Sequence, residues 1–294
     1  MTESAGRSLA RTGIAGLLTL AAIVPIGGAQ RDANRVYAVV TEGGGKPIKG
    51  LAAKDFTVKV DGAPRNIVSA APATDPVSVE ILTDRFGDDA TYGILGVRAT
   101  FSVIVQALHK GDPDGLISFR TFDGASILQV KPTNSVVELA SVIKRLLSAG
   151  TTPVLLEAVH DACLSLESAP SDRRVILAVI AGYKIDWSAG HARDVANDIF
   201  RTGASFWVLE GLSSQLPPIE GPERQILINQ VAPASGGVHD VVRVGTALET
   251  RGRWMADLIL SQYAVDYDGP RSGAKLEVGV TVPKAKVIAP TWVR

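Results

Sequence analysis

The residues best suited to acid–base or metal chemistry are four histidines, and their spacing supports neither. They are His109, His160, His191 and His239. No pair of them has the short spacing that is typical of metal ligands. His160 precedes Asp161 on a predicted helix, where adjacent side chains point in different directions. No nucleophile motif such as Gly-x-Ser-x-Gly accompanies them. We therefore expect no catalytic residues and predict that the chain is not an enzyme.

Two other features suggest chemistry at first inspection. Cys163, the single cysteine, lies on the apolar side of a predicted helix, which favours a buried small side chain over a reactive thiol. The run from Gly43 to Lys46 (GGGK) is superficially like a phosphate-binding loop, but it joins two predicted strands and no helix follows it. We interpret it as a turn.

The composition is that of an ordinary folded protein. Of 294 residues, 46% are hydrophobic and 20% are charged, which argues against wholesale disorder. Thirty basic residues balance thirty acidic ones, which argues against a generally basic nucleic-acid binder. We expect a protein partner and no nucleic acid.

The first thirty residues have the features of a secretory signal peptide. Arg7 and Arg11 supply a basic start, and the stretch Ile14–Ile26 is apolar. Small residues then lead to Ala29, where signal peptidase would cleave. We predict a signal peptide over residues 1–29 and export to the periplasm or beyond. An uncleaved membrane anchor is the alternative.

Residues 76–262 alternate predicted strands with predicted helices. Apolar residues recur at helical spacing over Ile94–His109, and Pro153 is well placed to open a helix. Arg174–Ile180 (RVILAVI) is typical of a strand buried on both faces. This alternation predicts an α/β fold with a doubly wound, mostly parallel sheet covered by helices on both faces.

Both ends of this domain carry predicted β structure. Residues 35–70 are interpreted as a β-hairpin extension, with Asp61-Gly62 as a tight turn. Residues 69–76 are rich in alanine and proline and are interpreted as a linker. Residues 263–294 return to strand alternation. Because the two segments flank the same domain, we expect them to pack together as one small β extension.

In an open sheet of this kind, ligands bind beyond the carboxyl ends of the strands, near the switch in strand order. The loops expected there are Thr83–Tyr92, Ala149–Pro153 and Ala181–Gly190, and we call them together the crest. Trp187 lies in the third loop. An exposed aromatic side chain there would anchor a protein partner, whereas the alternative is packing over the loop's own floor.

Several motifs in their order along the chain support a family resemblance. The N-terminal ones are Val39-Val40-Thr41, Gly50-Leu51, Asp55–Val58 and Asp61-Gly62. The later ones are the Asp84 loop, Gly150–Pro153, Arg174–Gly182 and Gln262–Val265. Together they resemble the von Willebrand factor type A (VWFA) domains, and more closely a bacterial exported group in which a short β segment precedes that domain. The resemblance covers about residues 35–285 and implies a Rossmann-like fold.

The resemblance also implies where a metal site would be. In VWFA domains three loops hold a divalent metal ion for adhesion, and the first of them supplies Asp-x-Ser-x-Ser. Here Asp84 matches the aspartate, Phe86 replaces the first serine and Asp88 replaces the second. Phe86 offers no oxygen to a hard cation such as Mg²⁺.

The other two loops match the family only in part. Thr151 or Thr152 takes the threonine position, and the sequence does not decide between them. Ala181 replaces the aspartate of the third loop, and Asp186 would reach that position only if the loop folded back. The oxygen ligands are too few for high affinity, so we expect a degenerate metal site and no cofactor.

These observations favour an exported protein–protein interaction or adhesion module that binds without a metal. Its partner would contact the crest at Asp84, Phe86, Thr151 and Trp187. The alternative is Mg²⁺-dependent adhesion through Asp84, Asp88 and Thr151 or Thr152. An enzyme with an unrecognised site is the least expected class.

Overall fold

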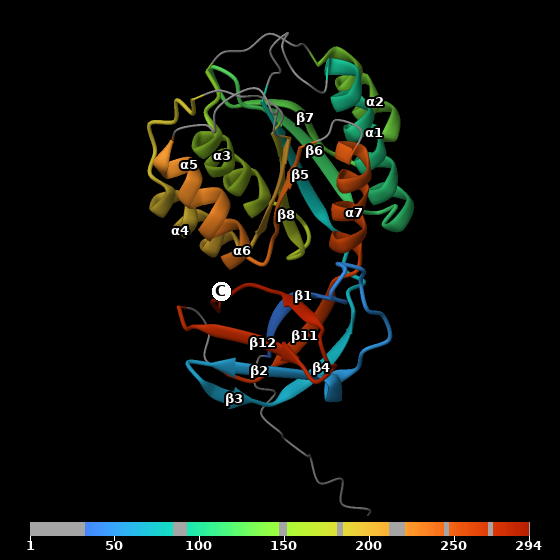
Figure 1. Cartoon of the computed structure of the whole chain (residues 1–294), viewed down its shortest axis with the longest axis vertical. Coiled ribbons are helices and arrows are strands. Elements are labelled where there is room, and N and C mark those ends of the chain that lie inside the picture. Colours follow the sequence, from blue (N-terminus) through green and yellow to red (C-terminus); the bar gives the residue numbers. More distant parts are fainter. Residues whose placement is uncertain are drawn as a thin grey trace, which may run out of the picture. The chain divides into compact units, whose positions relative to one another are not determined.

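A six-stranded sheet forms the middle of the α/β domain (Figure 1). In order across the sheet, its strands are β10 (His239–Val242), β9 (Ser205–Gly211), β8 (Arg174–Ile180), β5 (Ser78–Thr83), β6 (Leu116–Thr121) and β7 (Ile127–Thr133). The first five are parallel, and β7 runs antiparallel to β6. The predicted mostly parallel sheet is confirmed.

The computed structural model describes residues 33–84, 93–146, 152–180, 185–211, 221–243, 247–269 and 273–293. Several predictions therefore lie outside the described residues: the signal peptide (1–29), Phe86, Asp88, Thr151 and Ala181. None of the described helices is long and apolar enough to cross a membrane.

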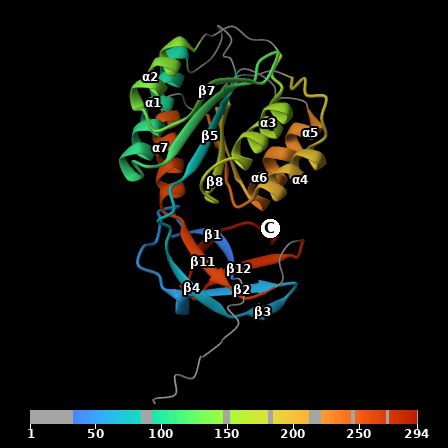
Figure 2. The ribbon, with the colours of Figure 1, turned by 180° about the vertical axis from the view of Figure 1, so that it is seen from behind.

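Helices cover both faces of the sheet (Figures 1 and 2). One face carries α1 (Gly93–Gly111), α2 (Val136–Arg145) and α7 (Ala247–Leu260). The other carries α3 (Leu155–Glu167), α4 (Ala192–Thr202) and a continuous stretch made of α5 (Pro222–Ile226), the π-helical turn η2 (Leu227–Val231) and α6 (Ala232–Ala234). Because β5 lies between β6 and β8, the chain adds strands first on one side of β5 and then on the other. This is the predicted doubly wound arrangement.

Apolar side chains fill the space between the sheet and each helical layer. On the face of α1, the rings of Phe101 and Phe119 meet edge to face with their centroids 4.9 Å apart. On the same face Trp207 is fully buried, and its indole Nε1 donates to Ser205 Oγ at 2.8 Å. Burying a large aromatic side chain requires such a partner for its polar atom.

The β extension contains two small sheets drawn from both ends of the chain. One has the order β13 (Lys286–Ile288), β1 (Asn34–Thr41), β11 (Tyr263–Tyr267) and β4 (Ile67–Pro72). The other has the order β12 (Leu276–Val280), β2 (Phe56–Val60) and β3 (Ala63–Arg65), with the short helix η1 (Ala53–Asp55) before β2. The C-terminal strands therefore pair directly with the N-terminal ones.

Two details differ from the sequence-based expectation. Residues 35–70 do not form one hairpin, because β1 and β2 belong to different sheets. The first part of the expected linker 69–76 belongs to β4, which ends at Pro72 and pairs antiparallel with β11. The tight turn lies where it was expected: Asp61 and Gly62 have φ values of 50° and 77° and connect β2 to β3.

Candidate partner-binding site at the carboxyl ends of the strands

The carboxyl ends of β5, β6 and β8 lie side by side at one edge of the sheet, where the strand order switches. Asp84 comes directly after β5, and only 3% of it is exposed. The Thr83 hydroxyl donates to the Asp84 carbonyl oxygen at 3.0 Å. Asp84 is thus buried and offers a partner little surface.

The threonine loop is tied to the turn between β6 and β7. The backbone N–H of Thr152 donates to Asp123 Oδ1 at 2.9 Å, and the Thr152 carbonyl accepts from Gly124 N at 2.7 Å. Val154 N donates to Phe122 O at 2.8 Å, which extends the connection by one more bond. The sequence analysis did not identify Asp123 as the residue that positions the threonine loop. An aspartate at the crest end of a strand was the available signal.

The third crest loop is tied to the start of α3. Asp186 Oδ2 accepts from Leu155 N at 3.3 Å, and Asp186 Oδ1 accepts from Ser188 N at 3.0 Å. Ser188 Oγ in turn accepts from Leu156 N at 3.0 Å. The first N–H groups of a helix have no partner within it, so both side chains act as caps supplied by another loop.

Glu157 completes this attachment from the helix side. Its Oε1 accepts from Ala189 N at 2.7 Å and from Gly190 N at 3.4 Å. Burial alone would raise the pKa of the Glu157 carboxyl, but hydrogen bonds from Ser188 and from these N–H groups outweigh it. The pKa is therefore lowered, and the ionised carboxylate holds the loop.

The attached loop presents apolar side chains to solvent. Trp187 N donates to Pro153 O at 2.8 Å, yet 61% of Trp187 is exposed. Ile185, two residues earlier, is also 61% exposed. The Trp187 side chain is thus directed to solvent, and the packing alternative considered from the sequence does not hold.

The described donors do not fit a Mg²⁺ site of the VWFA type. Asp84 and Thr152 remain as oxygen donors, and the sequence has Ala181 in place of the third-loop aspartate. Asp186 does not replace it, because its Oδ2 accepts from Leu155 N at the start of α3 and its Oδ1 accepts from Ser188 N in its own loop. Among the described residues, no three His, Cys, Asp or Glu side chains gather as a metal cluster would require.

His160 and Cys163, which the sequence analysis considered for catalysis, lie on α3 and not in the crest loops. His160 Nδ1 lies 2.7 Å from Asp198 Oδ2, whereas the adjacent Asp161 contacts Arg120 at 3.3 Å. Cys163 is buried, and burial raises the pKa of its thiol to about 12. The thiol therefore remains protonated at neutral pH, and the structure forms no His160–Asp161 pair.

Comparisons with known proteins give a fold but no close relative. No protein-family model matches the chain, and no curated protein matches it. Among solved structures, a von Willebrand factor type A protein from Catenulispora acidiphila superposes with a TM-score of 0.52 at 11% identity, over 89% of this chain and 75% of that one. BatB from Bacteroides thetaiotaomicron gives a TM-score of 0.47 at 14% identity, over 62% of this chain and 98% of that one. The chain has the fold of a VWFA domain.

Proposed function

We propose that this chain is an exported protein–protein interaction module that binds its partner through the crest without a metal ion. The observation that carries the proposal is Trp187, which is 61% exposed although its backbone is hydrogen-bonded to Pro153. Tryptophan is enriched among the residues that dominate binding energy at interfaces. A loop that is already ordered loses less entropy when a partner binds.

Metal independence is supported by the chemistry of the donors. Phe86 and Ala181 stand where VWFA domains place oxygen ligands, and Asp186 is engaged at the start of α3. The alternative remains a weak Mg²⁺ site formed by Asp84, Asp88 and one of the two threonines. Export is proposed from the signal-peptide features of residues 1–29.

Site-specific photo-cross-linking tests the crest as a binding surface. A photoreactive amino acid replaces Ile185 in the full chain, and the variant is expressed in the source cells and irradiated. We expect a discrete cross-linked product that Trp187→Ala removes. Val137→Ala, at an 81% exposed position on α2, is the matched control and leaves the product intact. A product that persists in Trp187→Ala would overturn the proposal.

Calorimetric titration of the purified chain with Mg²⁺ and with Mn²⁺ tests the metal alternative. We expect no saturable heat. Binding at about millimolar affinity or tighter that disappears in Asp84→Ala would instead establish a divalent site. Adding a chelator to the cross-linking experiment gives a second measurement, because metal-independent binding leaves the cross-linked yield unchanged.

A further inference from the structure

The β extension carries an uneven distribution of charge. The whole chain balances thirty basic residues with thirty acidic ones, whereas residues 42–55 and 281–286 contain five lysines and two carboxylates. All five lysines are exposed, and we call them together the lysine surface. They are Lys46, Lys49, Lys54, Lys284 and Lys286. Five positive charges against two negative ones leave an excess of three.

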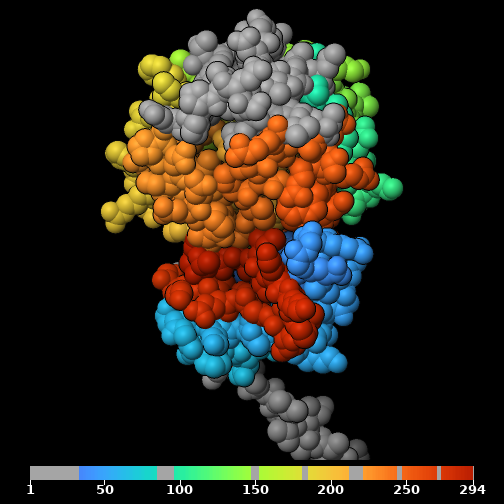
Figure 3. Space-filling model, viewed as in Figure 1, coloured from blue at the N-terminus to red at the C-terminus, as the bar shows by residue number. Residues whose placement is uncertain are grey.

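The two segments that carry these lysines meet at one end of the extension. Thr41, the last residue of β1, pairs with Lys286 of β13 and with Pro47. Thr281 N donates to Asp55 O at 2.8 Å, which connects the second segment to the first. Figure 3 shows the N-terminal residues of the extension, in blue, against the C-terminal ones, in red. The excess charge is therefore concentrated at this end and not spread over the molecule.

The two carboxylates at this end offset only part of the positive charge. Asp55 Oδ2 accepts from Ala52 N at 2.9 Å, so this carboxylate is engaged in its own turn. Glu42 lies at an exposed position in the turn after β1. None of the five lysines forms an ion pair with a described residue, and the ion pairs of the extension involve Arg35 and Lys275 instead.

Helix α7 lies against the same end but adds no positive charge to it. Trp254 Nε1 donates to Gly45 O at 2.8 Å, which holds the turn after β1 against α7. Arg251 is paired with Asp240 at 2.6 Å. The remaining charged residues of α7 alternate in sign along the helix: Glu249, Arg253 and Asp257. The excess thus arises from the lysine surface itself.

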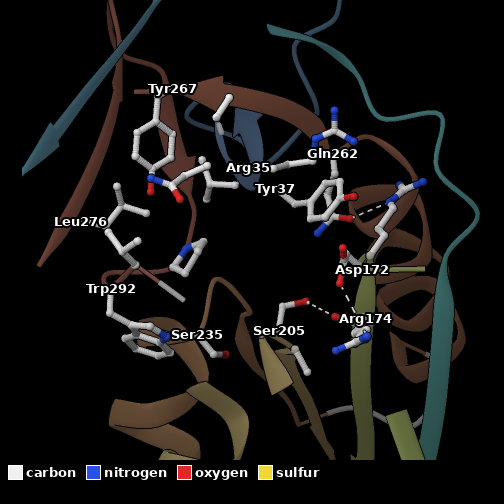
Figure 4. A pocket seen from close by; sticks show the side chains of 18 residues that line it. Arg35, Tyr37, Asp172, Arg174, Ser205, Ser235, Gln262, Tyr267, Leu276 and Trp292 are labelled. Atoms are coloured by element: carbon white, nitrogen blue, oxygen red, sulfur yellow. Dashed lines mark hydrogen bonds and ion pairs between the residues drawn. The ribbon is translucent and has the colours of Figure 1, made fainter. Parts of the chain in front are cut away.

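The cavity between the extension and the α/β domain shows the opposite situation (Figure 4). There Arg35 lies 2.8 Å from Asp266, and Arg174 lies 3.5 Å from Asp172. All three guanidinium nitrogens of Arg173 donate to protein acceptors. The charged groups of the cavity are thus engaged within the protein, whereas those of the lysine surface face solvent.

The backbone of Lys284 indicates that its side chain is retained for a reason other than stability. Its φ is 62°, in the left-handed region that favours glycine. It lies in a tight turn in which Ala285 N donates to Val282 O at 3.3 Å. Glycine would relieve the strain, yet the position carries an exposed lysine. A strained backbone conformation at an exposed charge supports a role for that charge.

A phosphate-covered lipid surface fits this arrangement better than a nucleic acid does. Lysine is a compact point charge on a flexible stem, and it requires no fixed geometry of its partner. Single-stranded nucleic acids are bound with the help of exposed aromatic rings on which bases stack. Trp254, beside the lysine surface, is instead hydrogen-bonded to Gly45 and has Arg251 over its ring at 3.8 Å.

The place of the extension in the chain supports the same partner. β1 begins eight residues after Ile26, the last residue of the apolar stretch in the sequence. Eight residues span at most about 29 Å. The extension therefore stays near any membrane that the apolar stretch enters.

We propose that the lysine surface binds the phosphates of an anionic phospholipid bilayer and holds the protein against it peripherally. The contact is electrostatic, because the one strongly exposed large apolar side chain among the described residues of the extension, Val68, lies on β4 and outside the lysine surface. Such binding weakens when salt screens the charges. The extension precedes the amino end of β5, whereas the crest lies beyond the carboxyl ends of the strands, so this surface is independent of the function proposed for the crest.

A fluorescent probe on the lysine surface tests the contact in the full chain. Cys163 is buried, so Thr281→Cys supplies one accessible thiol for labelling. The labelled chain is mixed with phosphatidylcholine vesicles, with or without phosphatidylglycerol, that carry a quencher on a lipid headgroup. We expect the anionic vesicles to quench the probe at about 0.1 M salt and not at about 1 M, because the screening length falls from about 10 Å to about 3 Å. Val137→Cys on α2 is the matched control, and its probe should stay unquenched.

The control position separates the lysine surface from residues 1–29. If the apolar stretch alone attached the chain to vesicles, the probes at Thr281→Cys and Val137→Cys would be quenched alike in both kinds of vesicle. That result would overturn the proposal. A Thr281→Cys probe that anionic vesicles leave unquenched would overturn it as well.

Charge removal measures the contribution of the lysines. The test variant replaces three lysines of the surface with Gln: Lys54, Lys284 and Lys286. The control variant makes the same change at three exposed lysines of the α/β domain: Lys110, Lys131 and Lys144. Each lysine near an anionic surface is worth about 5-fold in affinity, so the test variant should bind anionic vesicles about 100-fold more weakly. Equal weakening in both variants would show that only the net charge matters and would contradict a defined surface.

Lys284→Gly separates the charge from the fold. Because glycine relieves the left-handed strain, this variant should unfold at a higher urea concentration than the parent and yet bind anionic vesicles about 5-fold more weakly. Lys284→Arg keeps the charge and should keep the affinity. Unchanged vesicle binding in Lys284→Gly would contradict the role of this lysine, and weaker binding by a more stable variant has no explanation in misfolding.

Discussion

Arg120 and Glu80 form an ion pair in the interior of the α/β domain, with Arg120 Nε 2.6 Å from Glu80 Oε1. The Glu80 side chain is fully buried and that of Arg120 is 7% exposed. Glu80 lies in the middle of β5 and also accepts a hydrogen bond from Ser118 at 3.1 Å. Arg120 also forms an ion pair with Asp161 of α3, with Nη1 and Oδ2 3.3 Å apart. The pair thus connects the sheet to the helix whose start holds the third crest loop.

Replacing Arg120 with Met should lower the free energy of unfolding by about 3–5 kcal/mol, because it leaves the buried Glu80 carboxylate without its counter-charge. The double variant Glu80→Leu, Arg120→Met should recover much of that loss. Urea unfolding measures both. Arg201→Met, which removes ion pairs of a half-exposed arginine, is the control and should cost no more than about 1 kcal/mol. An equal loss in the single and double variants would show that the charge pair is not the cause.

The sequence predicted the α/β domain well because its signals are local. A run such as Arg174–Ile180 is apolar throughout, and only a strand buried on both faces accounts for it. The Glu80–Arg120 pair was missed although both residues interrupt apolar strands. Two opposite charges in neighbouring buried strands were a usable signal, since a buried charge requires a partner.

The β extension was harder to predict because its pairing is not local. Residues of β4 are mostly exposed and rich in alanine, so they carry no strand periodicity. They form a strand because β11, nearly 200 residues later in the chain, supplies the hydrogen-bonding edge. Contacts at the crest were hard to predict for the same reason. Asp186 is far from Leu155 in sequence, and only the fold brings it to the start of α3.

Replacing Asp186 with Ala should loosen the third crest loop. The change removes the acceptor of Leu155 N and should cost about 0.5–2 kcal/mol of stability, as for the loss of other helix caps. Hydrogen exchange at Trp187 N should accelerate as its contact with Pro153 opens more often. Asp194→Ala removes an exposed acidic residue from the first turn of α4 and should leave Trp187 exchange unchanged. Equal exchange rates in both variants would contradict the capping role.

Acid should destabilise the protein partly through Glu210. Burial raises the pKa of this carboxyl, but the hydrogen bond from His239 and the charge of Arg224 outweigh it, so the pKa is lowered in the folded state. The unfolded chain then binds the proton more readily than the folded one. The stabilising contribution is complete above the ordinary glutamate pKa and is lost as the pH falls through the lowered folded pKa.

Unfolding free energies measured from neutral pH to below pH 4 test this directly. Glu210→Gln should be less stable than the parent at neutral pH and should lose less stability on acidification. Glu42→Gln, at an exposed turn, should follow the parent curve. Parallel curves for the parent and Glu210→Gln would show that Glu210 does not contribute to the acid sensitivity.

The backbone at Gly237 should tolerate no side chain. A Cβ there would lie 1.8 Å from the carbonyl oxygen of Phe206, in the fully buried strand β9. Because that atom belongs to the backbone of an interior strand, it cannot move aside without disturbing the pairing of β9 with β8, in which Phe206 lies opposite Ile176. Gly237→Ala should therefore destabilise by about 3 kcal/mol or more, the upper end of overpacking. Gly44→Ala adds the same methyl group where nothing lies within 4 Å, and its unfolding midpoint in urea should match that of the parent.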